Sequence, residues 1–564
     1  MLGLTGRQRL QLVLAESMAL GLVGSALGLA LGTLLAWLAL RLLGGDLGGG
    51  FFPGVTPTLQ WSGGTAALYG VLGVAAALAG GWLPARAASR LPVAQTLKGL
   101  DSKPANQGQQ RFAVLLLLAA GLLSLAPPVA GVAVAAYLAI GLLLVGGITA
   151  LPALIAWLLD RLSRPAARWL LPMLAIERAR RVRASAAVAI SGVVAALSLA
   201  VALTVMVASF RQSVDDWLSV VLPADVYLRT ASGGGAADTA YLPAEFVQAV
   251  AKIDGVQRAA ASRTIALSLD PTQANVALLS RALGDPARTL PLLGAPLPVP
   301  DGAVAIYVSE PMLALYSARP GQDFAPLGQA LQGLAQSPGD LTRTRFFVAG
   351  VWRDYARQFG TITMDKADFE RITNDHRAND LALTLSPGAD SRAVQQAIRQ
   401  LADQSTLGSV LEFSSASEIR ALSLRIFDRS FAVTYWLQAV AIAIGLFGVA
   451  ASFSAQVLAR RKEFGLLAHL GLTRSQILRL VAAEGLAWTS LGALAGLALG
   501  LAVSVILVDV VNPQSFHWTM DLRIPWPRLL ALCAATVIAG TCTAWLAARA
   551  AASRDAVLAV KEDW

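Results

Sequence analysis

The sequence predicts an α-helical polytopic membrane protein of about eight transmembrane helices with one large α+β extracytoplasmic domain. Three observations predict this fold class. Hydrophobic residues make up 55% of the 564 residues and charged residues only 14%, whereas about a quarter of an ordinary soluble domain is charged. The mean hydropathy is +0.59. Apolar runs recur along the chain, and one long stretch, 211–430, is free of them.

Membrane spans are predicted wherever about 20 apolar residues follow one another, because the hydrocarbon layer is about 30 Å thick. The third run is short and ends at Pro127 and Pro128, so it could instead be a re-entrant segment paired with the fourth. The eight predicted spans are Ser17–Leu43, Thr65–Pro84, Phe112–Ala126, Val129–Leu158, Ala184–Phe210, Phe431–Leu458, Gly485–Val508 and Leu529–Ala548.

The stretch 211–430 mixes two kinds of hydrophobic pattern, which predicts an α+β domain. Short β-rich runs predict strands at Ala303–Val308, Arg345–Val351 and Leu381–Leu385. Amphipathic periodicity predicts helices at Pro243–Ile253 and Ser391–Ala402.

The distribution of basic residues predicts the orientation of the chain. The net charge is +10, yet the stretch 211–430 holds 20 basic and 23 acidic residues. The basic excess lies at the two ends and in alternate loops, while the loop 44–64 has no basic residue. With eight spans, the positive-inside rule therefore predicts that both termini lie in the cytoplasm and 211–430 outside. Basic loops of this kind can contact anionic lipid, and nothing in the pattern favours nucleic acid.

The chain contains an internal repeat. The segment Leu2–Glu16 matches Leu470–Glu484 at an offset of 468 residues, and Trp82–Ala87 matches Trp545–Ala550 at an offset of 463. Each copy then carries glycines at every fourth position, which lets two helices approach closely in lipid. These helix-packing candidates are Gly24, Gly28 and Gly32 in the first copy and Gly492, Gly496 and Gly500 in the second.

Catalytic and cofactor motifs are absent from the sequence. No Gly-x-x-x-x-Gly-Lys-Ser/Thr phosphate loop is present, and none of the six lysines follows a glycine. There is no Gly-x-Ser-x-Gly and no His-Glu-x-x-His. His376, His469 and His517 are scattered, which argues against a metal site. We therefore expect no enzyme activity and no directly bound cofactor, so that any ATP would be hydrolysed by another chain.

The segment Ala459–Gln476 resembles the cytoplasmic segment of FtsX-like, MacB-type ABC transporter permeases. Its pattern is basic-basic-Glu-apolar, then Gly-Leu-Thr, then Gln. The basic run Ile176–Ser185 resembles the helix that precedes the first span of a permease half. The duplicated layout and the run Val348–Gly360 are similar to the long YbbP-like subgroup, which has ten spans. Against that subgroup, the sequence lacks the N-terminal part of its first half.

The resemblance implies the following organisation. Residues 1–100 form a truncated first FtsX-like half, 101–165 two linking spans, 166–210 a basic helix and span, 211–430 the extracytoplasmic domain, and 431–564 the C-terminal permease domain.

The resemblance also implies a location, the bacterial cytoplasmic (inner) membrane, and a function. Separate cytoplasmic ABC ATPase subunits, two per complex, would drive movement that reaches the outer domain, a process called mechanotransmission. The expected work is export or extraction of a hydrophobic compound, lipid or lipoprotein, with a possible periplasmic partner on 211–430. The residues expected to couple to the ATPase are Arg460, Arg461, Lys462, Glu463, Phe464, Gly471, Thr473, Arg474 and Gln476, together with Gly3, Thr5 and Gln8.

Other interpretations stay open at this point. The chain could be a scaffold that activates a cell-envelope enzyme or senses a ligand. An ion-coupled transporter is disfavoured, because it would need ionisable residues at mid-membrane. Glu16 and Glu484 occupy matched positions, and each fits either a contact with the basic helix or a carboxylate at the interface. Thr473 can cap the next helix with Gln476. Asp354 and Tyr355 favour a turn residue and a packed aromatic over ligand contacts.

Overall fold

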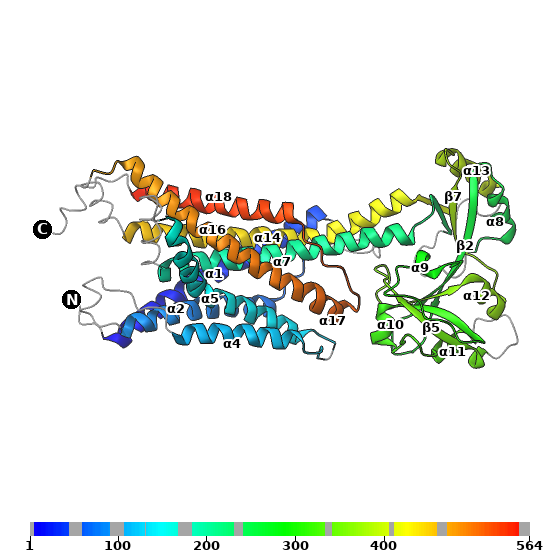
Figure 1. Cartoon of the computed structure of the whole chain (residues 1–564), viewed down its shortest axis with the longest axis horizontal. Coiled ribbons are helices and arrows are strands. Elements are labelled where there is room, and N and C mark those ends of the chain that lie inside the picture. Colours follow the sequence, from blue (N-terminus) through cyan, green and yellow to red (C-terminus); the bar gives the residue numbers. More distant parts are fainter. Residues whose placement is uncertain are drawn as a thin grey trace. The chain divides into compact units, whose positions relative to one another are not determined.

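The protein is described here from a computed structural model, which covers residues 5–43, 59–90, 107–129, 131–166, 183–230, 241–332, 341–404, 411–459 and 471–551. Long helices and one mixed sheet make up this part of the chain (Figure 1). Two compact units are present. One contains Met1–Gln110, Leu159–Ala184 and Ile426–Leu437, and the other contains Arg111–Leu158, Ser185–Arg425 and Gln438–Trp564.

The apolar runs of the sequence form helices, as predicted. Seven described helices are long and apolar enough to cross a membrane, whereas the run at Phe112–Ala126 forms a shorter apolar helix, α4. The helices outside the α/β domain are α1 (Gly6–Leu43), α2 (Gly63–Arg90), α4 (Gln107–Ser124), α5 (Val134–Ala166), α7 (Arg183–Val221), α14 (Ala416–Ala459), α16 (Arg474–Ile506), α17 (Asn512–Phe516) and α18 (Trp526–Ala551).

Two of these helices continue beyond their apolar runs. α7 extends past Phe210 to Val221, because Val214, Trp217 and Leu218 bury one face of the additional turns. α14 begins at Ala416, and Arg420 on it lies 3.7 Å from Asp215 of α7. Both helices therefore extend to the α/β domain. The length of an apolar run alone does not predict these additional turns, because they are amphipathic.

The α/β domain contains one eight-stranded sheet with the order β5-β4-β6-β3-β2-β7-β1-β8. β4 pairs with β5 and β3 with β6 in parallel, and the other pairs are antiparallel. The strands are β1 (Val226–Thr230), β2 (Val256–Leu267), β3 (Val276–Arg281), β4 (Ala303–Ser309), β5 (Arg345–Trp352), β6 (Thr361–Asp365), β7 (Asp380–Leu385) and β8 (Leu411–Ser415). The three strands predicted from the sequence are β4, β5 and β7.

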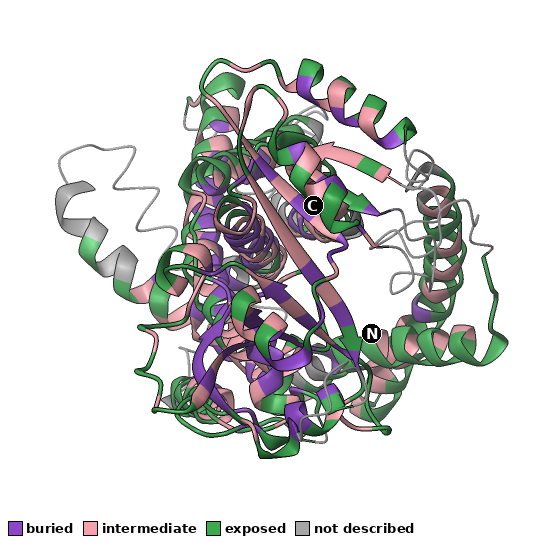
Figure 2. Cartoon of the chain, turned by 90° about the vertical axis from the view of Figure 1, so that its right-hand side faces the viewer, coloured by how far each residue is buried: buried purple, intermediate pink, exposed green. Residues whose placement is uncertain are grey.

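Short helices cover the sheet and enclose two hydrophobic cores. One core joins β3, β4, β5 and β6 to α10, α11 and α12, and the other joins β1 and β7 to α8 and α13. Buried residues gather along the strands (Figure 2). The two predicted helices are α8 and α13. The helices of the domain are α8 (Ala244–Ala251), α9 (Pro286–Thr289), α10 (Glu310–Leu315), α11 (Ala325–Gln332), α12 (Lys366–Thr373) and α13 (Ser391–Asp403).

Candidate functional site

The start of α16 is a capped turn that the sequence predicts. Gly471 has φ +95°, a left-handed backbone conformation that glycine adopts without strain. The Thr473 backbone N–H donates to Gln476 Oε1 at 2.8 Å, and the Gln476 N–H donates to Thr473 Oγ1 at 3.3 Å. This reciprocal pair is a capping box, which satisfies backbone donors that the helix leaves free. The cap therefore fixes the angle at which the chain enters α16.

The first copy has the same cap at the start of α1. The Thr5 backbone N–H donates to Gln8 Oε1 at 2.9 Å, and the Gln8 N–H donates to Thr5 Oγ1 at 3.4 Å. In both copies the cap residues are exposed, and so is Arg474, the first residue of α16. The two copies thus share a capped turn with an exposed Thr and an exposed Gln, and differ in that Gly6 stands in place of Arg474.

The helical run that begins with α16 continues to Phe516. The loop that follows this run contacts the α/β domain. The register pairs Ser309 at the end of β4 with Trp352 at the end of β5. Because neighbouring parallel strands end at the same sheet edge, the next residues, Glu310 and Arg353, emerge side by side. Both of them contact the loop that joins α17 to α18.

Five residues make this contact, which we call the junction and define as Glu310, Arg353 and Tyr355 with Thr519 and Asp521. Glu310 accepts hydrogen bonds from the Thr519 backbone N–H (3.1 Å) and from Thr519 Oγ1 (2.7 Å). The two guanidinium nitrogens of Arg353 each lie 3.0 Å from an oxygen of Asp521, a bidentate ion pair. Tyr355 Oη donates to the Thr519 carbonyl at 2.9 Å. The junction therefore ties the loop to the edge of the sheet.

Burial and neighbouring charges shift the pKa values of three junction side chains. Burial raises the pKa of the Glu310 carboxyl above its ordinary value, against the lowering effect of Thr519 and Arg353. The hydrogen bonds from Arg353 lower the pKa of Asp521. Burial raises the pKa of Tyr355 to about 12, so the phenol stays protonated and remains a donor.

Aromatic rings and α7 complete the junction. The ring of Tyr355 lies 5.1 Å from Trp518 and 5.8 Å from Trp217 of α7, both in edge-to-face geometry. α7 also holds the loop directly, because Ser213 Oγ accepts the Asp521 backbone N–H at 3.2 Å and Ser209 Oγ accepts that of Arg523 at 2.9 Å. A displacement of α7 or of the loop would therefore disturb the contacts made by Arg353 and Tyr355 at the sheet edge.

Hydrogen bonds and close packing hold the segment between β5 and β6. Asp354 is 1% exposed and accepts hydrogen bonds from the Ala356 N–H (3.0 Å) and from Thr361 Oγ1 (2.6 Å). Gly360 has φ +111°, and a Cβ there would meet Met312. Asp354 and Tyr355 are thus a turn residue and a packed aromatic, the interpretation that the sequence favours.

The glycine stripe of α16 packs against α7. A Cβ built on Gly496 would lie 3.1 Å from Leu197, and one on Gly500 would lie 2.7 Å from the Ser198 carbonyl oxygen. Gly492 faces Ile190 and Val193 in the same way. The small residues of the stripe therefore let α16 and α7 approach closely.

Comparison with known proteins identifies the class of this architecture. Residues 1–93 and 437–556, which contain the two repeat copies, match the family model for the FtsX-like permease C-terminal region. These two segments are therefore similar to FtsX-like permeases.

A relative agrees with this similarity. The chain is 27% identical over 573 residues to an uncharacterized ABC transporter permease protein of Mycobacterium tuberculosis. The match covers 96% of this chain and 64% of the relative, so the chain spans less than two thirds of the length of that relative. That relative is named as an ABC transporter permease, and the long apolar helices of the present chain make it a multi-pass membrane protein.

Two solved structures are similar to part of the chain. The periplasmic region of MacB from Actinobacillus actinomycetemcomitans is 11% identical, with a TM-score of 0.25, and covers 36% of this chain and 94% of that one. The extracellular domain of the noncanonic ABC-type transporter YknZ from Gram-positive bacteria is 12% identical, with a TM-score of 0.24, and covers 34% of this chain and 98% of that one.

Only some of the predicted coupling residues lie in the part of the chain that the structure describes. Gly471, Thr473, Arg474 and Gln476 lie together at one cap, and Thr5 and Gln8 lie at the equivalent cap. Glu484 is 9% exposed, whereas Glu16 is exposed, so the two matched carboxylates have different surroundings. The predicted coupling residues outside the described part of the chain are Gly3, Arg460, Arg461, Lys462, Glu463 and Phe464.

The junction is the part of the site that the sequence does not reveal. Glu310 and Thr519 are separated by 209 residues, and neither belongs to a motif or to the repeat. The contact depends on the parallel order of β4 and β5, which cannot be read from the sequence. The aromatic residues of Phe516–Trp518 are a sequence feature that could have drawn attention to the loop.

Proposed function

We propose that this protein is an FtsX-like permease, the membrane subunit of an ABC transporter complex, and couples ATP hydrolysis by a separate cytoplasmic ATPase subunit to work by its extracytoplasmic α/β domain. One observation carries the proposal. The helical run Arg474–Phe516, 43 residues long, begins at the exposed cap and ends next to the loop that the junction binds. The run therefore offers a continuous connection between a docking surface and the α/β domain.

The proposed mechanism follows from the stiffness of that run. The backbone hydrogen bonds of a helix resist bending, so a push at Arg474 is carried along the axis rather than absorbed. The Leu507–Val511 segment has π-helical geometry, the one irregularity in the described run, and it precedes the loop. Small shifts of a helix at a packed interface are a common way to move a domain.

Two capped turns support two ATPase subunits. The Thr5–Gln8 and Thr473–Gln476 caps have the same hydrogen bonds and the same exposure. We propose that each cap contacts one ATPase on the cytoplasmic side of the inner membrane. The proposed substrate is a hydrophobic compound, lipid or lipoprotein, which is exported or extracted, and this part rests on the resemblance to the family.

Co-purification with a cytoplasmic ABC ATPase subunit from the same organism tests the proposal. Arg474→Glu reverses the charge of an exposed cap residue without touching the core, and Arg479→Glu, on an exposed position further along α16, is the matched control. We expect Arg474→Glu to reduce co-elution and permease-stimulated ATP hydrolysis at least about tenfold, as removal of a central interface charge can, and Arg479→Glu to keep both.

Two results would contradict the proposal. One is full ATPase association when Arg474→Glu is combined with Gly6→Glu, the same charge at the equivalent position of the first copy. The other is a wild-type permease that binds a cell-envelope protein through its α/β domain and no ATPase, which would favour the scaffold interpretation.

A further inference from the structure

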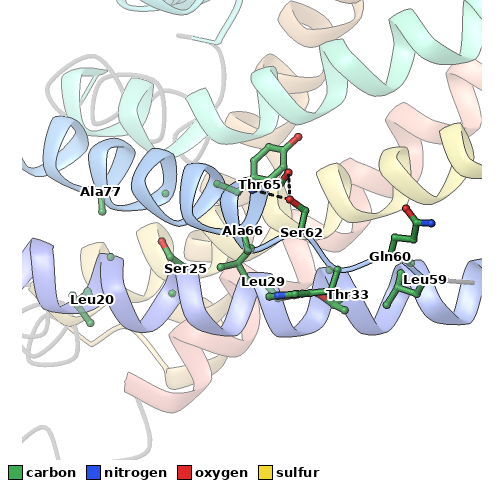
Figure 3. A pocket seen from close by; sticks show the side chains of 18 residues that line it. Leu20, Ser25, Leu29, Thr33, Leu59, Gln60, Ser62, Thr65, Ala66 and Ala77 are labelled. Carbon is green, nitrogen blue, oxygen red and sulfur yellow. Dashed lines mark hydrogen bonds between the residues drawn. The ribbon is translucent and has the colours of Figure 1, made fainter.

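Two cavities lined by described residues differ in their chemistry. α1 and α2 line a groove with glycine, alanine and leucine together with hydroxyl and amide side chains (Figure 3). A second cavity, of about 350 Å³, lies in the α/β domain, and two arginines and an aspartate are among the residues that line it. This second cavity therefore has charged groups with which to select a ligand. We call it the hollow and define it by Arg229, Thr264, Ala266, Ala277, Arg357 and Asp380.

The hollow lies where the two halves of the sheet meet. β2 pairs with β7 as far as Ser262 and with β3 from Arg263 onward. Because side chains alternate along a strand, Ile265 is buried in the core on one face of the sheet, while Ala266 lines the hollow on the other. Ala266 pairs directly with Ala277 of β3. Two methyl groups therefore form the floor of the hollow and leave room above it.

Two arginines from distant parts of the chain line the hollow. Arg229 lies on β1, and its Nε is 2.6 Å from Asp380 Oδ1 on the neighbouring strand β7. Arg357 lies on the segment between β5 and β6, and its Nη1 is 3.1 Å from Asp354 Oδ2. The Arg357 side chain is only 30% exposed, so water screens its charge in part. Ion pairs therefore hold both guanidinium groups at the same cavity.

The two carboxylates have several hydrogen-bond donors, whereas the guanidinium groups keep unused ones. Asp380 also accepts from Thr264 Oγ1 at 3.2 Å. Asp354 is 1% exposed and accepts two further hydrogen bonds within its own segment. Within the described part of the chain, Arg229 and Arg357 each use one of three guanidinium nitrogens in these contacts. The hollow is therefore rich in free donors and suits a ligand with acceptor oxygens.

We propose that the hollow binds the phosphate group of a small phosphate monoester. Such a group has three strong acceptor oxygens in a tetrahedral arrangement, so it can accept from two guanidinium groups that come from separate elements. A planar carboxylate is satisfied by the fork of one arginine. The volume of about 350 Å³ lies within the range of small-molecule sites, about 300–1,000 Å³.

A lipid head group and a free phosphorylated metabolite offer this same chemistry, and the experiment distinguishes them. The proposal does not depend on coupling to an ATPase.

Calorimetric titration with glycerol 3-phosphate tests the proposal. The full chain is kept in maltoside detergent without phosphate buffer, and glycerate serves as the carboxylate analogue. Arg229→Gln removes one guanidinium group. Arg345→Gln is the matched control, because Arg345 forms the same kind of ion pair, with its Nε 2.8 Å from Asp323, at an exposed site outside the hollow.

A second variant fills the hollow and keeps both arginines. Ala277→Leu places a larger side chain on the floor, and Ala282→Leu, at an exposed position just after β3, is its control. Thermal unfolding and size-exclusion profiles verify that all variants fold.

We expect saturable binding of glycerol 3-phosphate to the wild type and to both controls. Binding to Arg229→Gln should be at least about tenfold weaker, as loss of charge-assisted hydrogen bonds can cause, and Ala277→Leu should not bind. Titration with dihexanoyl phosphatidate identifies the source: tighter binding than that of glycerol 3-phosphate indicates a lipid head group, and equal or weaker binding indicates a free phosphorylated compound.

Three results would overturn the proposal. These are a wild type that binds neither phosphate saturably, glycerate that binds as tightly as glycerol 3-phosphate, and phosphate binding that Arg229→Gln or Ala277→Leu leaves unchanged.

Discussion

Glu310 shows how one side chain fixes the α17–α18 loop to the α/β domain. It is 6% exposed and satisfies both the backbone N–H and the hydroxyl of Thr519. A buried carboxylate is tolerated only when it is well hydrogen-bonded, because burial removes its hydration. The sequence offers no sign of this role, since Glu310 reads as an ordinary residue at the start of a helix and its partner is distant along the chain.

The raised pKa of Glu310 predicts a pH dependence of the junction. Since the folded pKa lies above the ordinary value of 4.5, the contribution of this group to stability is complete below about pH 4.5. It is lost as the pH rises through the folded pKa. The depressed pKa of Asp521 acts only below its ordinary value of 3.8, and Tyr355 and Arg353 do not titrate in this range.

Hydrogen exchange of the α17–α18 loop checks this prediction. After correction for intrinsic rates, we expect protection of the Thr519 segment to fall as the pH rises from about 4.5 through the raised pKa of Glu310. Glu310→Gln removes the charge, so its protection should not vary with pH over that window. An identical pH dependence in Glu310→Gln would assign the effect to another group.

Among the elements, α16 and α1 show most clearly what the repeat preserves and what it changes. The caps and the glycine stripes are common to both copies, and both were predictable from the sequence because they depend on local spacing. Which helix packs on a stripe was not predictable. That depends on the approach of α7 from a distant part of the chain, and identical stripes therefore have different surroundings.

Matched glycine substitutions measure this difference. A Cβ at Gly500 would lie 2.6 Å from Val201, whereas the equivalent Gly32 has free space. We expect Gly500→Ala to lower the free energy of unfolding by about 1–3 kcal/mol through overpacking. Gly32→Ala should leave it unchanged or raise it by up to about 1 kcal/mol through helix propensity. Unfolding in mixed micelles with increasing SDS measures both, and equal effects would contradict the packing described for α16.

At the scale of the whole molecule, the fold class, the helical spans and the strands β4, β5 and β7 follow from composition and periodicity. The sheet order and the junction do not, because they join residues that no local pattern relates. The protein thus combines features encoded by local sequence with contacts between distant residues. Locally encoded caps begin each repeat, and a long helical run connects one cap to contacts that only the folded chain creates.

The central claim is that the exposed caps and the junction are coupled through the Arg474–Phe516 run. The most direct test is hydrogen exchange of residues 517–525 and 353–360 in the complex of permease and ATPase, with and without ATP. We predict that ATP changes exchange in both segments of the wild type, and that Arg474→Glu abolishes the change. An ATPase that binds the permease and hydrolyses ATP at full rate while both segments exchange unchanged would contradict the account.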